Sequence, residues 1–247
     1  MKKAVILAAG MGTRLRPLTD LDHKCMTKVC GIPIIKQTLI NLRKNEFDET
    51  VIVVGYLRDK LMEEIKKLDC GLKISFVENA IYDQTNTAYS LKLGLETVGE
   101  FEELYVIEGD VFFEEGVLKR LIESKSDNAT ILERYNEELE GTFVELDSAG
   151  NVIDWRHKSD QEEGYELADK YKTVNLHKFS KEFVAETLMP AICSYMAGTG
   201  KNLPFEKVMR SIVSRHQDLI HGEVLCREKW YEIDDVHDLE KAEKLFG

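Results

Sequence analysis

Fixed positive charges follow a glycine-containing segment near the start of the chain. Residues 4–19 read Ala-Val-Ile-Leu-Ala-Ala-Gly-Met-Gly-Thr-Arg-Leu-Arg-Pro-Leu-Thr, and Lys24 comes shortly after them. Gly10 and Gly12 remove side chains where the backbone must bend, which lets a ligand come close. Exposed backbone N–H groups therefore converge with the charges of Arg14 and Lys24. This pattern favours a polyanion as ligand, and a nucleoside triphosphate is the commonest polyanion of that size.

Carboxylates follow two apolar segments that lie far apart in the chain. Asp110 comes shortly after the apolar run 104–107, and Asp234 and Asp235 end a segment that begins at Trp230. Such aspartates are common helix caps, and an adjacent pair can also offset a helix dipole. Aspartate oxygens are equally the ligands that Mg²⁺ prefers. Both interpretations are open for Asp110, whereas we expect Asp234 to bind metal and Asp235 to cap a helix.

Two better-known phosphate-binding loops do not fit the glycine segment. A dinucleotide fingerprint, G-x-G-x-x-G, needs glycine at position 15, where the chain has Leu15. A Walker A loop needs Gly-Lys followed by Ser or Thr, and that sequence does not occur in the chain. An accidental strand and glycine turn is the remaining structural alternative.

The elements that position these residues can be predicted from the apolar pattern. Short apolar runs predict buried strands at 4–8, 51–54, 73–77 and 104–107. Helical spacing predicts helices that begin near Pro33 and that cover 57–68 and 88–95. The alternating order predicts an α/β fold with a doubly wound, mostly parallel sheet. Ligands of such sheets bind at the carboxyl ends of the strands, where the glycine segment and Asp110 would lie.

The second half of the chain predicts a small antiparallel lobe. Strands are expected at 129–133, 142–146, 152–155, 174–179 and 230–233, with a hairpin turn at 148–151 and helices near 181–197, 204–215 and 236–245. The polar and acidic segment 156–171 is expected to be a loop over the site. We expect one domain, 1–247, with a nucleotide-binding half of about 1–125, a lobe of about 126–235 and a C-terminal helix at 236–247.

Composition excludes several classes of partner. The formal net charge of −12 argues against nucleic acid, because binding to phosphates along a strand needs a basic face. No apolar run approaches the ~20 residues of a membrane span, and the N-terminus lacks the pattern of a signal peptide. The five cysteines are widely spaced without a C-x-x-C pair, which is typical of reduced thiols. A cytoplasmic protein is therefore expected.

The segment from Leu7 to Lys24 resembles the signature of the NTP-transferase family, the nucleotidyltransferases that activate sugar 1-phosphates and related phospho-compounds. That signature reads L-A-A-G-x-G-T-R-L-x-P-L-T, followed by a lysine. The resemblance implies a Rossmann-like nucleotidyltransferase fold, and a nucleotide site that includes Leu7, Ala8, Ala9, Gly10, Met11, Gly12 and Thr13. The family usually has proline before the lysine, where this chain has His23. We expect this change to affect local rigidity more than chemistry.

The same resemblance assigns the catalytic charges. In nucleotidyl transfer every participant is negatively charged, so catalysis depends largely on alignment and charge neutralisation. The loop arginine and the following lysine of the family act on the triphosphate, which implies these roles for Arg14 and Lys24. Glu108-Gly109-Asp110 resembles the strand end where the family binds Mg²⁺. The resemblance thus implies Mg²⁺ held by Asp110, with Asp234 as the second ligand and Glu108 in a supporting role.

A narrower resemblance concerns the base. Tyr-Glu-Ile-Asp at 231–234 and the segment 79–91, with Asn-x-x-Tyr-Ser-Leu at 86–91, are similar to segments of bacterial cytidylyltransferases that act on phosphocholine or on phosphonates such as 2-aminoethylphosphonate. This implies that CTP is the nucleotide, with Asn86 and Ser90 on the pyrimidine. Asn86 could equally be only a helix cap.

The acceptor would bind in the second-half lobe. The segment 172–175 resembles one beside the acceptor pocket of the same enzymes, which implies a role for Lys172. Lys158 falls where sugar-1-phosphate enzymes have Glu-Lys-Pro, but its neighbours here break that pattern. Aromatic and acidic side chains of the lobe fit a cationic acceptor by cation–π and ionic contacts, although aromatic residues at strand spacing are more often core. The acceptor residues expected here are Lys158, Lys172, Glu133, Trp155 and Tyr231.

Three hypotheses follow. The first is a cytidylyltransferase that uses CTP, Mg²⁺ and a small phospho- or phosphono-acceptor. The second is a sugar-1-phosphate nucleotidyltransferase that uses UTP, GTP or dTTP, which the broken Glu-Lys-Pro segment disfavours. The third is a catalytically silent, nucleotide-sensing homologue, which the retained charges of Arg14, Lys24, Asp110 and Asp234 disfavour. A homodimer and a fusion to another catalytic domain both stay open.

Overall fold

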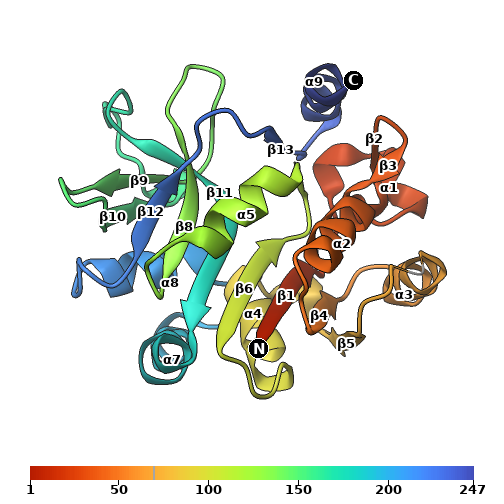
Figure 1. The fold of residues 1–247 in the computed structure, drawn as a ribbon, viewed down its shortest axis with the longest axis horizontal. Helices are drawn as coiled ribbons and strands as arrows, with labels where there is room; N and C mark the ends of the chain where they lie inside the picture. Colours follow the sequence, from red (N-terminus) through yellow and green to blue (C-terminus); the bar gives the residue numbers. More distant parts are fainter. Residues whose placement is uncertain (69) are drawn as a thin grey trace.

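Nine strands form one sheet through the centre of this computed structural model, which describes residues 1–68 and 70–247 (Figure 1). Seven of them lie in the order β10 (Val152–Arg156), β9 (Phe143–Leu146), β11 (Tyr171–Ser180), β6 (Glu103–Glu108), β1 (Lys2–Ala8), β4 (Glu49–Val54) and β5 (Ile74–Glu78). The other two are β8 (Ala129–Arg134), which pairs with β11, and β12 (His221–Val224), which pairs with β8. The central position of β1 brings the glycine segment to the middle of the sheet edge.

The parallel half has the predicted doubly wound form. β1 pairs in parallel with β4 and β6, and β4 pairs in parallel with β5. Successive side chains of β1 point to opposite faces: Val5 packs in one cluster with helix α4, and Ile6 in another with α2. One face is covered by α2 (Ile34–Lys44), α3 (Arg58–Lys67) and α5 (Glu115–Glu123), and the other by α4 (Thr87–Thr97), α7 (Met189–Thr199) and α8 (Phe205–Val213) (Figure 1).

The antiparallel strands extend this sheet and do not form a separate one. β11 pairs antiparallel with β6, and β8 and β9 pair antiparallel with β11. β11 begins at Tyr171, three residues before the predicted start, and the strand is almost wholly buried. The predicted lobe is therefore continuous with the nucleotide-binding half, and the longer strand carries Lys172 into the sheet.

Several elements were not predicted from the sequence. They include α5, β12 and the short strand β7 (Val111–Phe113). β7 pairs antiparallel with β13 (Trp230–Glu232). The other short elements are α1 (Leu18–Leu21), β2 (Lys28–Val29), β3 (Ile32–Pro33) and α6 (Lys181–Phe183), and α9 (Val236–Phe246) ends the chain. None of the helices in the described residues has both the length and the apolar character needed to span a bilayer.

His177 of β11 is a polar residue inside an apolar cluster. Its ring stacks on that of Phe179, with the centroids 5.9 Å apart, and its Nδ1 lies 2.9 Å from Thr130 Oγ1. Burial lowers the pKa of His177 from 6.5 to about 3. The ring is therefore neutral in the folded protein at neutral pH.

This depressed pKa predicts acid sensitivity of the fold. Below about pH 6.5 the unfolded chain binds a proton at this histidine and the folded chain does not, so the free energy of unfolding falls by ~1.4 kcal/mol per pH unit down to about pH 3. Urea denaturation at pH 7 and pH 5 should show a smaller loss of stability for His177→Gln than for the parent. Equal losses would show that His177 does not contribute.

Candidate functional site

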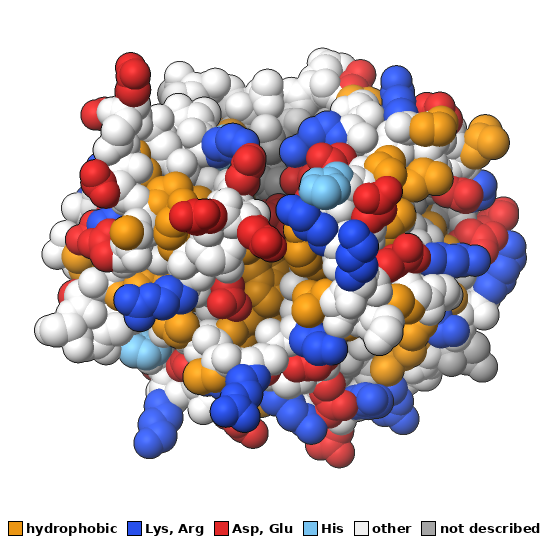
Figure 2. Space-filling view, turned by 90° about the horizontal axis from the view of Figure 1, so that it is seen from above, with side chains coloured by type: hydrophobic (Ala, Val, Ile, Leu, Met, Phe, Trp, Pro, Cys, Tyr) orange, Lys and Arg blue, Asp and Glu red, His pale blue; other side chains and the backbone are white. Residues whose placement is uncertain are grey.

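A cavity of about 200 Å³ lies at the carboxyl ends of β1 and β6, on the face seen in Figure 2. Leu7, Ala8, Ala9, Gly10 and Gly12 line one wall of it, as predicted for the glycine segment, whereas Met11 and Thr13 lie outside the lining. Acidic and basic side chains gather around the hollow in this view (Figure 2). Gly10 has open space where a Cβ would be, which leaves room for a ligand.

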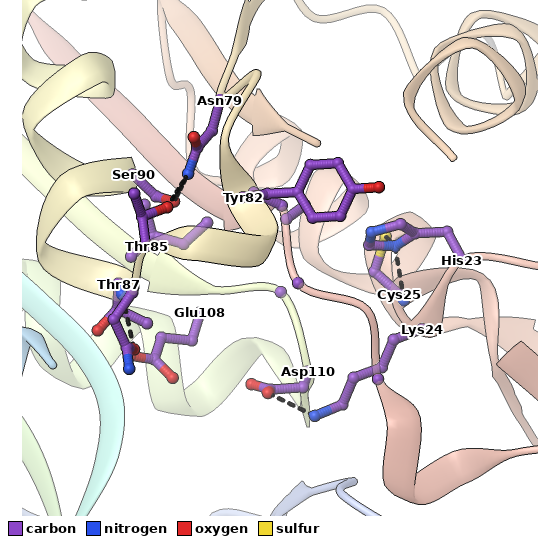
Figure 3. Close-up of a pocket in the computed structure, with 17 residues that line it drawn as sticks. His23, Lys24, Cys25, Asn79, Tyr82, Thr85, Thr87, Ser90, Glu108 and Asp110 are labelled. Atoms are coloured by element: carbon purple, nitrogen blue, oxygen red, sulfur yellow. Dashed lines mark hydrogen bonds and ion pairs between the residues drawn. The ribbon is translucent and has the colours of Figure 1, made fainter. Parts of the chain in front are cut away.

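Lys24 lies between the two aspartates that were predicted to bind metal. Its Nζ donates to Asp110 Oδ2 and to Asp234 Oδ1, each at 2.7 Å, and its ion pair with Asp110 is visible in Figure 3. Arg14 Nη2 lies 2.9 Å from the other oxygen of Asp234. Desolvation opposes the charge on Lys24, but Asp110 and Asp234 outweigh it and raise the pKa of the lysine. Desolvation also acts against the charge on Asp234, and Lys24 and Arg14 together lower the pKa of that carboxyl.

Strand pairing brings the two distant aspartates together. Glu232 of β13 lies opposite Val111 of β7, and the Ile233 N–H donates to the Asp110 carbonyl at 2.9 Å. Asp234 thus follows directly after a backbone hydrogen bond to Asp110. Asp235 caps α9 in a capping box with Asp238, which confirms the role predicted for it.

Two glycines permit the close approach of these segments. Gly12 has φ +57, and a Cβ there would lie 2.9 Å from Lys24 Cβ. Gly109 lies against the end of β1, where a Cβ would come within 2.7 Å of the Leu7 carbonyl oxygen. A side chain at either position would displace the groups that hold Lys24 and Asp110 in place.

The acidic group is larger than the sequence suggested. Glu108, Asp110 and Glu232 each offer an oxygen within 4.8 Å of the others, which is close enough for one metal ion. Asp110 Oδ1 is buried and has no hydrogen-bond partner among the described residues. An unpartnered buried carboxylate oxygen is costly unless a cation meets it, so the residues fit a divalent metal such as Mg²⁺.

Lys172 and Asn175 of β11 hold this group from the opposite side. Lys172 Nζ donates to Glu232 Oε2 at 2.9 Å, and Asn175 Nδ2 donates to Glu232 Oε1 at 3.2 Å. Burial, followed by the neighbouring acids Glu206, Asp110 and Glu232, raises the pKa of Glu108. Burial also raises the pKa of Glu232, although Lys172 opposes the shift. The cluster therefore carries more carboxylates than its lysines can neutralise.

The far wall of the cavity is polar and neutral. Asn79 Nδ2 donates to Thr85 Oγ1 at 2.8 Å and to Ser90 Oγ at 3.1 Å (Figure 3). Ser90 and Asn86, which were predicted to bind the pyrimidine, both line the cavity. Asn86 is also the N-cap of α4, where its side chain accepts from the Thr87 N–H at 2.8 Å. Asn79 begins the segment 79–91 that the resemblance places at the base, but no role was predicted for its own side chain.

The predicted acceptor residues are dispersed. Trp155 is a correction: its side chain is fully buried against His177 in the core and cannot contact an acceptor. Tyr231 is partly buried against the apolar cluster of α9, on the opposite face of β13 from Glu232, and its predicted contact with an acceptor stays a prediction. Lys158 is exposed and pairs with Glu140, whereas Glu133 accepts from Trp230 Nε1 at 3.3 Å.

Comparisons with known proteins give a family and several relatives. The sequence model of the family described as Nucleotidyl transferase matches residues 3–244. The CMP-5'-(3-aminopropyl)phosphonate synthase of Streptomyces rubellomurinus is 30% identical over 99% of this chain, which spans 39% of that protein's length. The CTP:phosphoglutamine cytidylyltransferase of Campylobacter jejuni is 26% identical over 96% of this chain and 97% of its own. The solved inositol-1-phosphate CTP transferase of T. maritima has a TM-score of 0.78 at 21% identity, covering 99% of this chain and 94% of its own.

The position of Lys24 predicts a competition between its ammonium and a metal ion. Removal of the positive charge in Lys24→Met should tighten Mn²⁺ binding about tenfold in the absence of nucleotide, because two carboxylates lose their cation. Titration calorimetry measures this directly. Lys158→Met, which removes an exposed lysine outside the cluster, is the matched control and should bind Mn²⁺ like the parent. Unchanged affinity in Lys24→Met would refute the competition.

Proposed function

Because this chain belongs to the nucleotidyl transferase family, we propose that it transfers a cytidylyl group from CTP to a small phospho- or phosphono-compound. The observation that carries the proposal is the Lys24 ammonium, which lies between Asp110 and Asp234 at a cavity lined by the glycine segment. The names of two relatives, an aminopropylphosphonate synthase and a phosphoglutamine cytidylyltransferase, support the choice of CTP and of this acceptor class.

In the proposed reaction an acceptor oxygen attacks the α-phosphorus of CTP. A new P–O bond forms, the bond between the α-phosphorus and the bridging oxygen breaks, and pyrophosphate leaves with that electron pair. The acceptor oxygen is already ionised near neutral pH, since the second pKa of a phosphate is about 6. No general base is therefore required. The residues must instead align the two anions and neutralise their charge.

We assign this neutralisation to Arg14 and Lys24. Once the aspartates have another cation, the Lys24 ammonium is free to bind the α-phosphate, and the exposed Arg14 guanidinium can bind the departing phosphates. A bound Mg²⁺ would supply charge stabilisation at the reacting phosphate. Asp110 is the proposed ligand common to both possible sets, with Asp234 as predicted from the sequence or with Glu108 and Glu232 as grouped by the fold.

The base is proposed to lie at the α4 wall of the cavity, and the acceptor next to the acidic group, beyond the cavity lining. Ser90, which accepts from Asn79, and Asn86 face the pyrimidine on the α4 side. The acceptor lies beside Glu232, whose carboxylate Lys172 and Asn175 position from β11. We further propose that the enzyme is cytoplasmic. The length of the first relative is consistent with fusion of this unit to another domain.

The metal assignment predicts the effects of three carboxylate variants. Asp110→Asn should lower kcat at least ~100-fold, because a principal electrostatic contribution is lost. Asp234→Asn and Glu232→Gln should differ, and the variant that raises the Mg²⁺ concentration needed for half-maximal rate identifies the second ligand. Glu140→Gln, an exposed acid, is the control. Near-normal turnover of Asp110→Asn at millimolar Mg²⁺ would contradict the assignment.

The proposed substrates can be tested with a matrix of rates. CTP and UTP are each combined with 2-aminoethylphosphonate, 3-aminopropylphosphonate, phosphocholine and glucose 1-phosphate, and pyrophosphate release is measured. CTP with one of the amine-bearing acceptors should be fastest, because a site built for cytosine leaves a buried polar group unpaired with uracil at a cost of ~1–3 kcal/mol. Faster turnover of UTP with the sugar phosphate would favour a sugar-1-phosphate nucleotidyltransferase. No turnover of any pair would favour a silent homologue.

A further inference from the structure

His23 takes the place of the proline that usually precedes the lysine in the resembled family, and its ring lies at the cavity. The residue is only 3% exposed, yet it lines the same cavity as Tyr82 and Cys25. Figure 3 shows the imidazole at the wall between Tyr82 and Lys24. Local rigidity does not explain a histidine here, because proline restricts the backbone more.

The two ring nitrogens of His23 have different surroundings. Nδ1 accepts from the Cys25 N–H at 3.2 Å and lies 3.1 Å from Cys25 Sγ. Since Nδ1 accepts, the single proton of the neutral ring must be on Nε2. Nε2 is buried and has no hydrogen-bond partner among the described residues.

The imidazole ring of His23 is neutral at neutral pH. Burial, and after it the charge of Lys24, lower the pKa of His23 from 6.5 to about 4, while the Ala8 carbonyl acts in the opposite direction. That carbonyl does not meet the geometry of a hydrogen bond to Nε2. His23 thus has a buried neutral N–H donor without a hydrogen-bond partner among residues 1–68 and 70–247, on a side chain that lines the cavity.

We propose that the Nε2–H of His23 donates a hydrogen bond to a neutral oxygen in the nucleoside half of the bound nucleotide. The inference rests on the proposed function in that a nucleotide fills the cavity. Arg14 and Lys24 supply charged donors for the phosphates, whereas a neutral donor suits a pyrimidine carbonyl or a ribose oxygen. A buried donor that is left unpaired is costly, so a ligand that supplies the acceptor binds more tightly. His23 is then a specificity residue of the nucleotide site.

Two variants separate this role from the capping of the Lys24 segment. In His23→Asn the amide oxygen can replace Nδ1 and accept from the Cys25 N–H, but the donor at Nε2 is lost. In His23→Gln the longer amide can place a donor near Nε2, but the Nδ1 acceptor is lost. Thermal unfolding of both variants checks that the fold is retained.

The expected result is a loss in His23→Asn that His23→Gln largely restores. His23→Asn should raise the KM for CTP and the Kd for CTP without acceptor about 5- to 10-fold, the size expected for one hydrogen bond, with kcat little changed. The reverse pattern, in which His23→Gln is the damaged variant or kcat falls in both, would show that His23 only shapes the Lys24 segment. Equal affinity of the parent and His23→Asn would overturn the proposal.

A comparison of CTP with CMP tests which part of the nucleotide accepts the hydrogen bond from His23. Calorimetric titration with CMP should show the same fold-loss in His23→Asn as with CTP, because the contact lies in the nucleoside half. A loss that disappears with CMP would overturn that placement. If the parent prefers another triphosphate, the cytidylyl assignment fails, and the same comparison with that nucleotide and its monophosphate still decides the role of His23. A parent that binds no nucleotide would overturn both.

Discussion

The partly buried ammonium of Lys24 and the two aspartates around it form the contact on which the site depends. Asp110 follows β6 and Asp234 follows β13, which lie far apart in the chain, and each carboxylate is 2.7 Å from the lysine nitrogen. Two partly buried carboxylates repel each other and lose hydration, so they approach this closely only around a cation. The same cation requirement makes the pair suitable for a metal ion.

Charge imbalance extends beyond this contact. Glu108 and Glu232 lie behind Asp110, and Lys172 and Asn175 neutralise or bind only part of the group. The raised pKa values of Glu108 and Glu232 reflect burial among other acids. An arrangement of this kind is unfavourable for stability alone. In the proposed reaction, a divalent ion would neutralise the excess carboxylates, and the anionic substrates would pair with the cations.

Prediction from the sequence succeeded where a short segment carries its own signal. β1, β4, β5 and β6 follow the apolar runs, and Asp235 caps the last helix as its neighbours indicated. It failed where the orientation of a side chain depends on packing. Trp155 is fully buried in the core, because packing and not residue type decides which face of a strand is covered. β7 was missed because three residues are too few for a periodic pattern.

The sequence by itself was enough to identify the glycine segment, the cations that follow it and Asp110 as candidate site residues. Each of these signals depends on residues close together in the chain. Only the tertiary structure decided which carboxylates share a site with Asp110. The pairing of β13 with β7 sets Glu232 and Asp234 beside it, and the early start of β11 places Lys172 against Glu232. These contacts join residues far apart in sequence, so no local pattern contains them. Burial likewise gave the two nitrogens of His23 different surroundings: one accepts a hydrogen bond, and the other has no partner in the part of the chain that the structure describes.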